Sequence, residues 1–124
     1  MAQLIILPTV SDPRGKLTII EKILPFSVRR IYYIYGVLDP SVSRGGHRHK
    51  TTIQALVCIA GSCDIHIDDG NKKQTVILDT PDKCLVLAPE DWHTMDNFSS
   101  NAVLLVLASE YYDAVDYIDN PYGD

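Results

Sequence analysis

Two histidines, His47 and His49, stand two residues apart in the run Arg44–Lys50. In a β-strand this spacing points both imidazoles toward the same face. An isolated histidine is usually a satisfied core or surface residue, but two imidazoles on one inward face cost stability unless they are paired or used. The pair therefore favours an acid–base or metal site. A bulge at Gly45-Gly46 would also turn Arg44 from the outer face to the inner one.

Strands must position these histidines, because nearly every segment alternates with a period of two and is bounded by turn residues. We predict ten strands: Gln3–Ile6, Leu17–Ile23, Arg30–Tyr35, Gly45–Lys50, Ile53–Ile59, Cys63–Ile67, Gln74–Leu78, Cys84–Leu87, His93–Asn97 and Val103–Ala108. The segment Glu110–Ile118 loses this alternation, and we expect one or two helical turns there, with Tyr111 and Val115 covering a barrel mouth. The chain 1–124 is thus expected to be a single all-β domain with a short C-terminal helical turn.

The composition narrows the classes of partner and compartment. A formal net charge of −5 argues against nucleic acid as the main partner, because phosphate binding needs a broad basic surface. The apolar runs are far shorter than the ~20 residues of a membrane span, and the N-terminus lacks a signal-peptide pattern. The three cysteines lie in alternating apolar segments without metal-type spacing. We therefore expect a cytoplasmic protein with reduced cysteines and no membrane partner.

Strands of this kind build either a sandwich or a closed barrel, and alternation alone does not decide between them. Two motifs resemble those of the cupin superfamily. The first cupin motif is His-x-His followed by Glu and then Gly, and here His47-Arg48-His49 is followed by Gln54 and Gly61. The second motif resembles Pro89–His93. The resemblance implies a cupin jelly-roll β-barrel with the histidines of both motifs lining its interior.

Gln54 is the main departure from the cupin pattern, because metal-binding cupins place a carboxylate there. A neutral amide is a poor ligand for divalent ions, which weakens a metal site built on His47, His49 and His93. Three imidazole nitrogens can still hold zinc, so a metal site stays open as an alternative. We expect free acid–base histidines, with no metal and no other cofactor.

A closer resemblance runs through almost the whole chain. The matching segments are Asp12–Gly15, Pro25-Phe26, Arg30–Ile34, Arg44–Lys50, Leu56–Cys58, Asp68–Gly70, Pro89, Trp92-His93, Asp96–Phe98, Leu105–Asp113 and Asp116–Ile118. Together they resemble the nucleotide-sugar 3,4-ketoisomerases, small cupins that act on dTDP-4-keto-6-deoxyglucose. The resemblance implies a cofactor-free isomerase, a homodimer, that moves the carbonyl from C4 to C3 of the hexose. Such products are aminated next, giving 3-amino-3,6-dideoxy sugars for surface polysaccharides, such as O-antigen, or for secreted glycosides.

The catalytic roles follow from the same resemblance. His47 aligns with the base of the family and is expected to remove the C3 proton, which the neighbouring ketone acidifies, giving an enediolate. His49 and Tyr33 are expected to handle the oxygens or to deliver a proton to C4. Gln54 is expected to donate to the charged oxygens of the intermediate, or to be a hydrogen-bonded core amide.

Substrate binding is assigned to further residues around the catalytic His47, His49 and Tyr33. The pyrophosphate needs cations, and Arg44 and Arg30 are the best candidates because a guanidinium binds phosphate bidentately. His93 is expected to line the pocket, and Trp92 either to stack on a ring or to close the core. Arg14-Gly15 resembles the branch of the family whose product is the 3-keto-6-deoxygalactose.

Three other functions stay open. A dTDP-sugar epimerase would exchange protons without moving the carbonyl, and a non-catalytic sugar-nucleotide-binding cupin would bind without either change. A metal-dependent dioxygenase is disfavoured by Gln54. For the homodimer, an exposed N-terminal strand such as Gln3–Ile6 would suit pairing between subunits.

Overall fold

The computed structural model describes residues 1–123, in which strands and turns alternate and the one helical element is a 3₁₀ helix, η1 (Ala114–Asp116). The strands are β1 (Gln3–Ile6), β2 (Thr9–Asp12), β3 (Gly15–Thr18), β4 (Arg30–Tyr35), β5 (Arg44–His49), β6 (Gln54–Ala60), β7 (Cys63–Asp68), β8 (Lys73–Leu78), β9 (Lys83–Leu87), β10 (Trp92–Asp96), β11 (Val103–Ala108) and β12 (Tyr117–Ile118). The predicted all-β fold with a short C-terminal helical turn is confirmed. Within the described residues no helix has the length and apolar character to cross a membrane.

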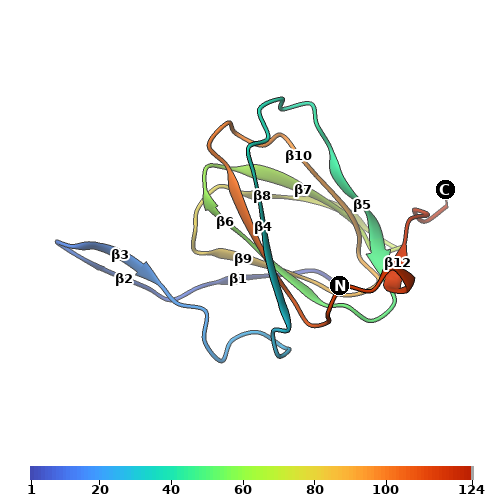
Figure 1. The fold of residues 1–124 in the computed structure, drawn as a ribbon, viewed down its shortest axis with the longest axis horizontal. Coiled ribbons are helices and arrows are strands. Elements are labelled where there is room, and N and C mark those ends of the chain that lie inside the picture. Colours follow the sequence, from blue (N-terminus) through green and yellow to red (C-terminus); the bar gives the residue numbers. More distant parts are fainter. Residues whose placement is uncertain (124) are drawn as a thin grey trace.

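Two five-stranded antiparallel sheets form the barrel, with strand orders β1-β9-β6-β11-β4 and β12-β5-β10-β7-β8 (Figure 1). Their inner faces share one apolar cluster, to which Leu56, Leu85 and Leu104 contribute from the first sheet and Ile65 from the second. These four side chains are almost completely buried, and burial of each stabilises the fold by about 1.5–3 kcal/mol. The two sheets thus pack against each other through a core to which both contribute side chains.

The outer face of the first sheet is covered in part by the segment between β3 and β4. Ile20, Ile23 and Phe26 of this segment pack against Ala55 and Val57 of β6. Because β6 is covered on both faces, its first five residues are all buried and, apart from Gln54, its sequence is apolar without alternation.

A bulge in β5 sets the direction of Arg44. His47 lies opposite His93 of β10, whereas Arg44 lies opposite Met95, so β5 has one residue more than β10 between these pairs. The extra residue falls at Gly45-Gly46, where both φ angles are positive, +83° and +81°. Since Met95 is buried in the core, Arg44 takes the inner face, as expected from the two glycines.

The N-terminal region departs from the expectation. The predicted strand Leu17–Ile23 is shortened to β3, which pairs with β2 in a two-stranded hairpin that projects away from the barrel (Figure 1). The strand Gln3–Ile6 pairs with β9 on one side and is the edge strand of the first sheet, so its other edge is unpaired within the described residues. The projecting β2–β3 hairpin is a second exposed N-terminal element, since within the described residues it pairs with neither sheet of the barrel.

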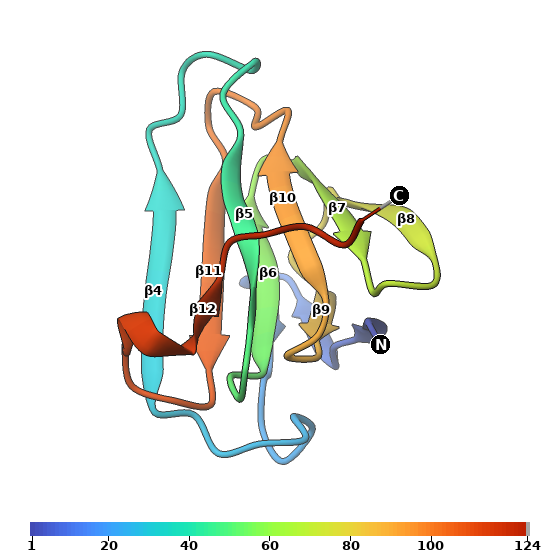
Figure 2. The same ribbon diagram turned by 90° about the vertical axis from the view of Figure 1, so that its right-hand side faces the viewer.

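The C-terminal segment closes against the barrel differently from the expectation. Tyr111 and Val115 are exposed, so they do not cover the barrel mouth. Instead, η1 leads into β12, which adds to the edge of the second sheet beside β5 (Figure 2). This pairing places Asp116 and Tyr117, rather than the two expected residues, next to His49.

Candidate active site

Two neighbouring strands of the second sheet bring the three histidines together. His47 and His49 point inward from β5, and His93 points inward from β10, opposite His47. The ring centroid of His47 lies 5.1 Å from that of His49 and 5.0 Å from that of His93. The rings of His49 and His93 are 6.5 Å apart. His49 and His93 are buried, whereas His47 is partly exposed, which makes His47 the most accessible of the three.

Tyr117 adds a fourth ring to this cluster. It lies opposite His49 in the β12–β5 pairing, and so points to the same face as the histidines. Its ring centroid is 4.7 Å from that of His47 and 4.6 Å from that of His49. The sequence alone did not identify Tyr117 as a site residue, although it lies in the Asp116–Ile118 match to the ketoisomerases.

Hydrogen bonds orient the two buried histidines. Nδ1 of His49 lies 2.8 Å from Oδ2 of Asp116, and Nδ1 of His93 lies 3.1 Å from the carbonyl oxygen of Asp91. A carbonyl oxygen can only accept, so Nδ1 of His93 carries the hydrogen. The Nε2 atoms of both rings are buried and have no partner within residues 1–123. Such buried polar atoms without a protein partner are rare in folded proteins, and these two are free to bond a ligand or a water molecule.

The barrel interior favours the neutral form of all three imidazoles. Burial lowers the pKa of His93 to about 4, with the nearby His47 and His49 acting in the same direction. Burial also lowers the pKa of His49, although its contact with Asp116 opposes this. For His47, burial and the neighbouring His49 together lower the pKa. Neutral imidazoles with a free nitrogen act as bases at neutral pH.

Gln54 supplies a third buried atom without a partner. Its Nε2 donates to the hydroxyl of Tyr32 over 3.1 Å, and its Oε1 is buried and unpaired within the described residues. In this orientation of the amide, the free oxygen of Gln54 is an acceptor, suited to a hydroxyl group of a ligand. Burial raises the pKa of Tyr32, so its hydroxyl stays protonated at neutral pH.

The two predicted arginines lie on the inner side of the barrel wall. Nη1 of Arg30 lies 3.4 Å from the hydroxyl of Tyr117, and its guanidinium stacks 4.5 Å from the centroid of the Tyr32 ring. Arg44 is exposed at the start of β5, on the inner face. Arg30 thus places positive charge beside the aromatic cluster, while Arg44 is accessible to an anionic group at the barrel end.

The assignment of Tyr33 to the site is wrong for this chain. Residues of β4 alternate between half-buried and exposed, and Tyr33 falls in the exposed set, with 61% of its surface accessible. Its ring packs beside that of Tyr35 on the outer face. The inward tyrosine of β4 is Tyr32, which contacts Gln54, because neighbouring residues in a strand point to opposite faces.

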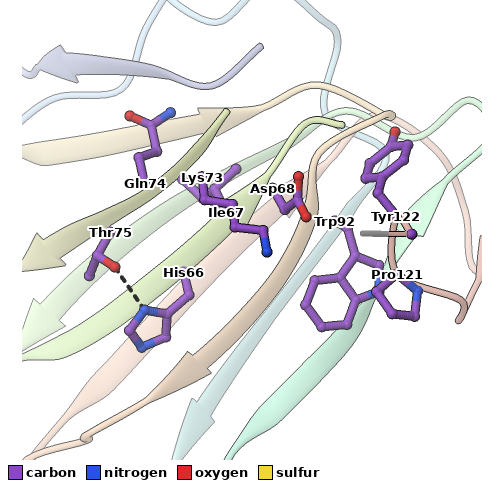
Figure 3. Close-up of a pocket in the computed structure, with 10 residues that line it drawn as sticks. His66, Ile67, Asp68, Lys73, Gln74, Thr75, Trp92, Pro121 and Tyr122 are labelled. Atoms are coloured by element: carbon purple, nitrogen blue, oxygen red, sulfur yellow. Dashed lines mark hydrogen bonds between the residues drawn. The ribbon is translucent and has the colours of Figure 1, made fainter. Parts of the chain in front are cut away.

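Trp92 lies outside the barrel, so it does not share the interior with His93. The two residues are adjacent in β10, so they point to opposite faces, and Nε1 of Trp92 donates to the carbonyl of Asp119. Trp92 lines a groove on the outer surface together with Pro121 and Tyr122 (Figure 3).

One group of side chains in the described residues has the close spacing of metal ligands, and it lies outside the barrel. Within residues 1–123, Asp64, His66 and Asp96 are the one group of three acidic, cysteine or histidine side chains whose ligand atoms all lie within 4.8 Å of one another. These residues belong to the outer face of β7 and β10, away from His47. The three barrel histidines do not form such a group within the described residues.

The groups that line the barrel are of the types that transfer protons. Two imidazole nitrogens and one amide oxygen present buried acceptor atoms near a third, more accessible imidazole. Arg30 and the hydroxyl of Tyr117 supply positive charge and a donor on the same side. This arrangement suits a ligand rich in hydroxyl groups that loses and regains protons.

Comparisons with known proteins agree with this chemistry. Residues 1–123 match the family model described as FdtA, WxcM-like, C-terminal. The chain is 48% identical over 111 residues to a TDP-4-oxo-6-deoxy-alpha-D-glucose-3,4-oxoisomerase from Aneurinibacillus thermoaerophilus, covering 88% of this chain and 79% of that protein.

Solved structures show the same fold. The WlaRB TDP-quinovose 3,4-ketoisomerase from Campylobacter jejuni superimposes with a TM-score of 0.91 at 42% identity, covering 96% of this chain and 92% of that one. A mutant of the 3,4-ketoisomerase QdtA from Thermoanaerobacterium thermosaccharolyticum, in complex with TDP-4-keto-6-deoxyglucose, also gives a TM-score of 0.91, at 41% identity, covering 96% of this chain and 87% of that one.

Proposed function

Because the chain belongs to the FdtA family (WxcM-like, C-terminal), we propose that it is a dTDP-sugar 3,4-ketoisomerase acting on dTDP-4-keto-6-deoxyglucose. The single observation that carries the proposal is a group of three buried acceptor atoms in the barrel that have no partner within the described residues: Nε2 of His49, Nε2 of His93 and Oε1 of Gln54. A hexose can satisfy all three with its hydroxyl groups. The accessible His47 then lies beside the sugar as a base.

The first step is removal of the C3 proton. The ketone at C4 acidifies this proton, and the neutral imidazole of His47 accepts it, so the electron pair of the C3–H bond moves into the enediolate. The intermediate carries negative charge on the C4 oxygen. The guanidinium of Arg30 and the hydroxyl of Tyr117, which lie 3.4 Å from each other, stabilise that charge.

The second step moves the remaining protons. The hydrogen on the C3 oxygen passes to Nε2 of His49 and from there to the C4 oxygen. The imidazolium of His47 returns a proton to C4, and the carbonyl forms at C3. Every proton and electron pair is accounted for within the sugar and two histidines, so no oxidant or reductant is consumed.

The dTDP group is held outside the histidine cluster. Arg44 is exposed on the inner face at the barrel end, where it can reach the pyrophosphate as a bidentate donor. The product we propose is the 3-keto-6-deoxygalactose, on the resemblance of Arg14-Gly15 to that branch of the family. A ketone at C3 is the group that an aminotransferase would use next, which suits the synthesis of 3-amino-3,6-dideoxy sugars.

The test is an NMR measurement of purified protein with dTDP-4-keto-6-deoxyglucose in deuterated water. We expect a 3-keto product that carries deuterium at C4, because the accessible imidazolium of His47 exchanges its proton with the solvent before delivering it. The coupling constants at C4 or C5 would give the configuration of C4. Exchange at C3 without movement of the carbonyl would identify an epimerase instead. Tight binding of dTDP with an unchanged substrate would identify a non-catalytic binding protein.

A homodimer is part of the proposal, and two features support it. The hairpin β2–β3 projects from the barrel with its apolar pair Val10 and Leu17 more than half exposed. An isolated two-stranded hairpin is marginally stable in water. The outer face of β4 also exposes the row Ile31, Tyr33 and Tyr35. A second copy covering both features would bury this apolar surface, since isologous dimers use self-complementary patches.

Leu17→Asp is expected to make the protein monomeric, because a charge would have to be buried in the proposed interface. Light scattering coupled to size exclusion gives the mass of the wild-type protein and the variant. Ile77→Asp is the matched control, since Ile77 is similarly exposed, at 53%, but lies on β8 of the other sheet. A monomeric wild-type protein, or a Leu17→Asp variant that remains dimeric, would contradict this assembly.

The cytoplasm is the proposed location. Cys58, Cys63 and Cys84 are buried and free in the structure. Unpaired buried thiols suit a reducing compartment, in which disulfides are rare.

A further inference from the structure

Asp116 lies directly behind His49 and was not among the residues assigned from the sequence. Its Oδ2 is 2.8 Å from Nδ1 of His49 and also accepts from the hydroxyl of Thr52. Its Oδ1 accepts from the backbone N–H groups of Lys50 and Thr51 and from the Thr51 hydroxyl. The side chain is only 9% exposed, so both carboxylate oxygens are held by the loop that follows β5.

These donors keep Asp116 ionised. Burial by itself would raise its pKa, but the hydrogen bonds from Thr52, Thr51 and His49 outweigh burial and hold the pKa well below its usual range. An ionised carboxylate can only accept hydrogen bonds. Nδ1 of His49 must therefore carry the hydrogen, and the free electron pair of the ring is on Nε2, which is the atom without a partner.

We propose that Asp116 is a positioning residue that fixes His49 in the Nδ1–H form and so makes its Nε2 the acceptor of the proton from the C3 oxygen. The inference rests on the proposed function for the identity of that proton. Asp116 does not touch the sugar. It acts through His49, first by selecting the form that accepts and then by stabilising the imidazolium until the proton passes to the C4 oxygen.

The contrast with His93 supports this division of roles. Both rings are buried, and both have a partner at Nδ1 and a free Nε2. The partner of His93 is a neutral backbone carbonyl, that of Asp91, whereas the partner of His49 is a carboxylate. A carboxylate stabilises a protonated ring far better than a carbonyl does. His49 is thus equipped to carry a proton, while His93 can only accept a hydrogen bond.

The decisive variant is Asp116→Asn. The backbone N–H of Thr51 requires an acceptor at the position of Oδ1, so the amide oxygen of the asparagine must stay there. The N–H of Lys50 does not set this orientation, because it also donates to the backbone carbonyl of Asp116 over 2.9 Å. Its NH₂ group then replaces Oδ2 and donates to Nδ1 of His49. This forces the hydrogen of the ring onto Nε2, and His49 can no longer accept a proton there.

We expect ¹⁵N NMR of the histidine rings to show His49 with hydrogen on Nδ1 in the wild-type protein and on Nε2 in Asp116→Asn. The value of kcat should fall about 10²-fold or more, as for loss of a general acid–base group, with dTDP binding unchanged. Asp96→Asn is the matched control, because Asp96 contacts His66 over the same 2.8 Å on the outer face of the barrel. It should leave activity and the His49 signals unchanged.

Two results would overturn the inference. One is a wild-type His49 with hydrogen on Nε2, which can be measured whether or not the variant folds. The other is an Asp116→Asn enzyme whose kcat stays within a few-fold of wild type. A wild-type protein that lacks isomerase activity but shows the expected His49 signals would instead refute the proposed function and leave the control of His49 by Asp116 standing.

Discussion

Replacing His47 by asparagine is expected to lower kcat for the isomerisation about 10²–10⁴-fold, the range that a general acid–base group contributes. His47 is the most accessible of the three barrel histidines, and its ring contacts those of His49, His93 and Tyr117. Burial and the neighbouring His49 lower its pKa, so it is neutral at neutral pH and ready to accept the C3 proton. Asparagine keeps a polar side chain there but offers no comparable base.

The measurement follows deuterium incorporation and product formation by NMR, with dTDP binding measured by calorimetry. Binding should persist in His47→Asn, because the pyrophosphate is assigned to arginine and not to this ring. His66→Asn serves as control, since His66 lies on the outer face of β7, where it bonds Thr75 and Asp96. A His47→Asn enzyme with near wild-type turnover would move the role of the C3 base to another residue.

The strands were predictable because apolar and polar residues alternate along most of the chain. Gln3–Ile6, Arg30–Tyr35 and Val103–Ala108 were predicted with the bounds that the structure has. The strand β6 is covered on both faces and does not alternate, and there an apolar run between turn residues was sufficient to predict a strand. The hairpin of β2 and β3 was missed in part, because all four residues of β2 are exposed and no buried face imposes alternation on them.

Face assignments failed where neighbouring residues are chemically alike. The run Ile31-Tyr32-Tyr33-Ile34 offers an apolar and an aromatic residue to each face, so the sequence does not say which tyrosine points inward. The contacts that decide are Tyr32 with Gln54 inside and Tyr33 with Tyr35 outside. The histidines were predicted correctly as a pair because residues two apart share a face whichever face it is.

The second half of the site depends on contacts between distant parts of the chain. Asp116 reaches His49 across 67 residues of sequence, and Tyr117 does so through a strand of two residues. Neither a two-residue strand nor a single 3₁₀ turn has a periodic signature. The resemblance of Asp116–Ile118 to the ketoisomerases was the one available signal, and it indicated a family without indicating a role.

Replacing Gly61 by alanine is expected to destabilise the fold by about 2–5 kcal/mol, from backbone strain and overpacking combined. Gly61 forms the turn between β6 and β7 and has φ +66°. A Cβ there would lie 2.8 Å from Cα of Ala102 and would also collide with the Ser99 hydroxyl. That hydroxyl accepts from the backbone of Ser62, so the turn cannot move aside without losing this bond.

Gly36→Ala separates the two causes of this loss. Gly36 has a similar φ, +72°, but a Cβ there would meet no atom within 4 Å. Its substitution should therefore cost only the backbone strain, about 1 kcal/mol, which corresponds to a fall in Tm of roughly 4 °C. Thermal unfolding of both variants should show a fall at least twice as large for Gly61→Ala. Equal falls in Tm would mean that the loop carrying Ser99 and Ala102 moves to make room for the added methyl group. The positive φ alone would then be the reason for a glycine at position 61, the end of the first cupin motif.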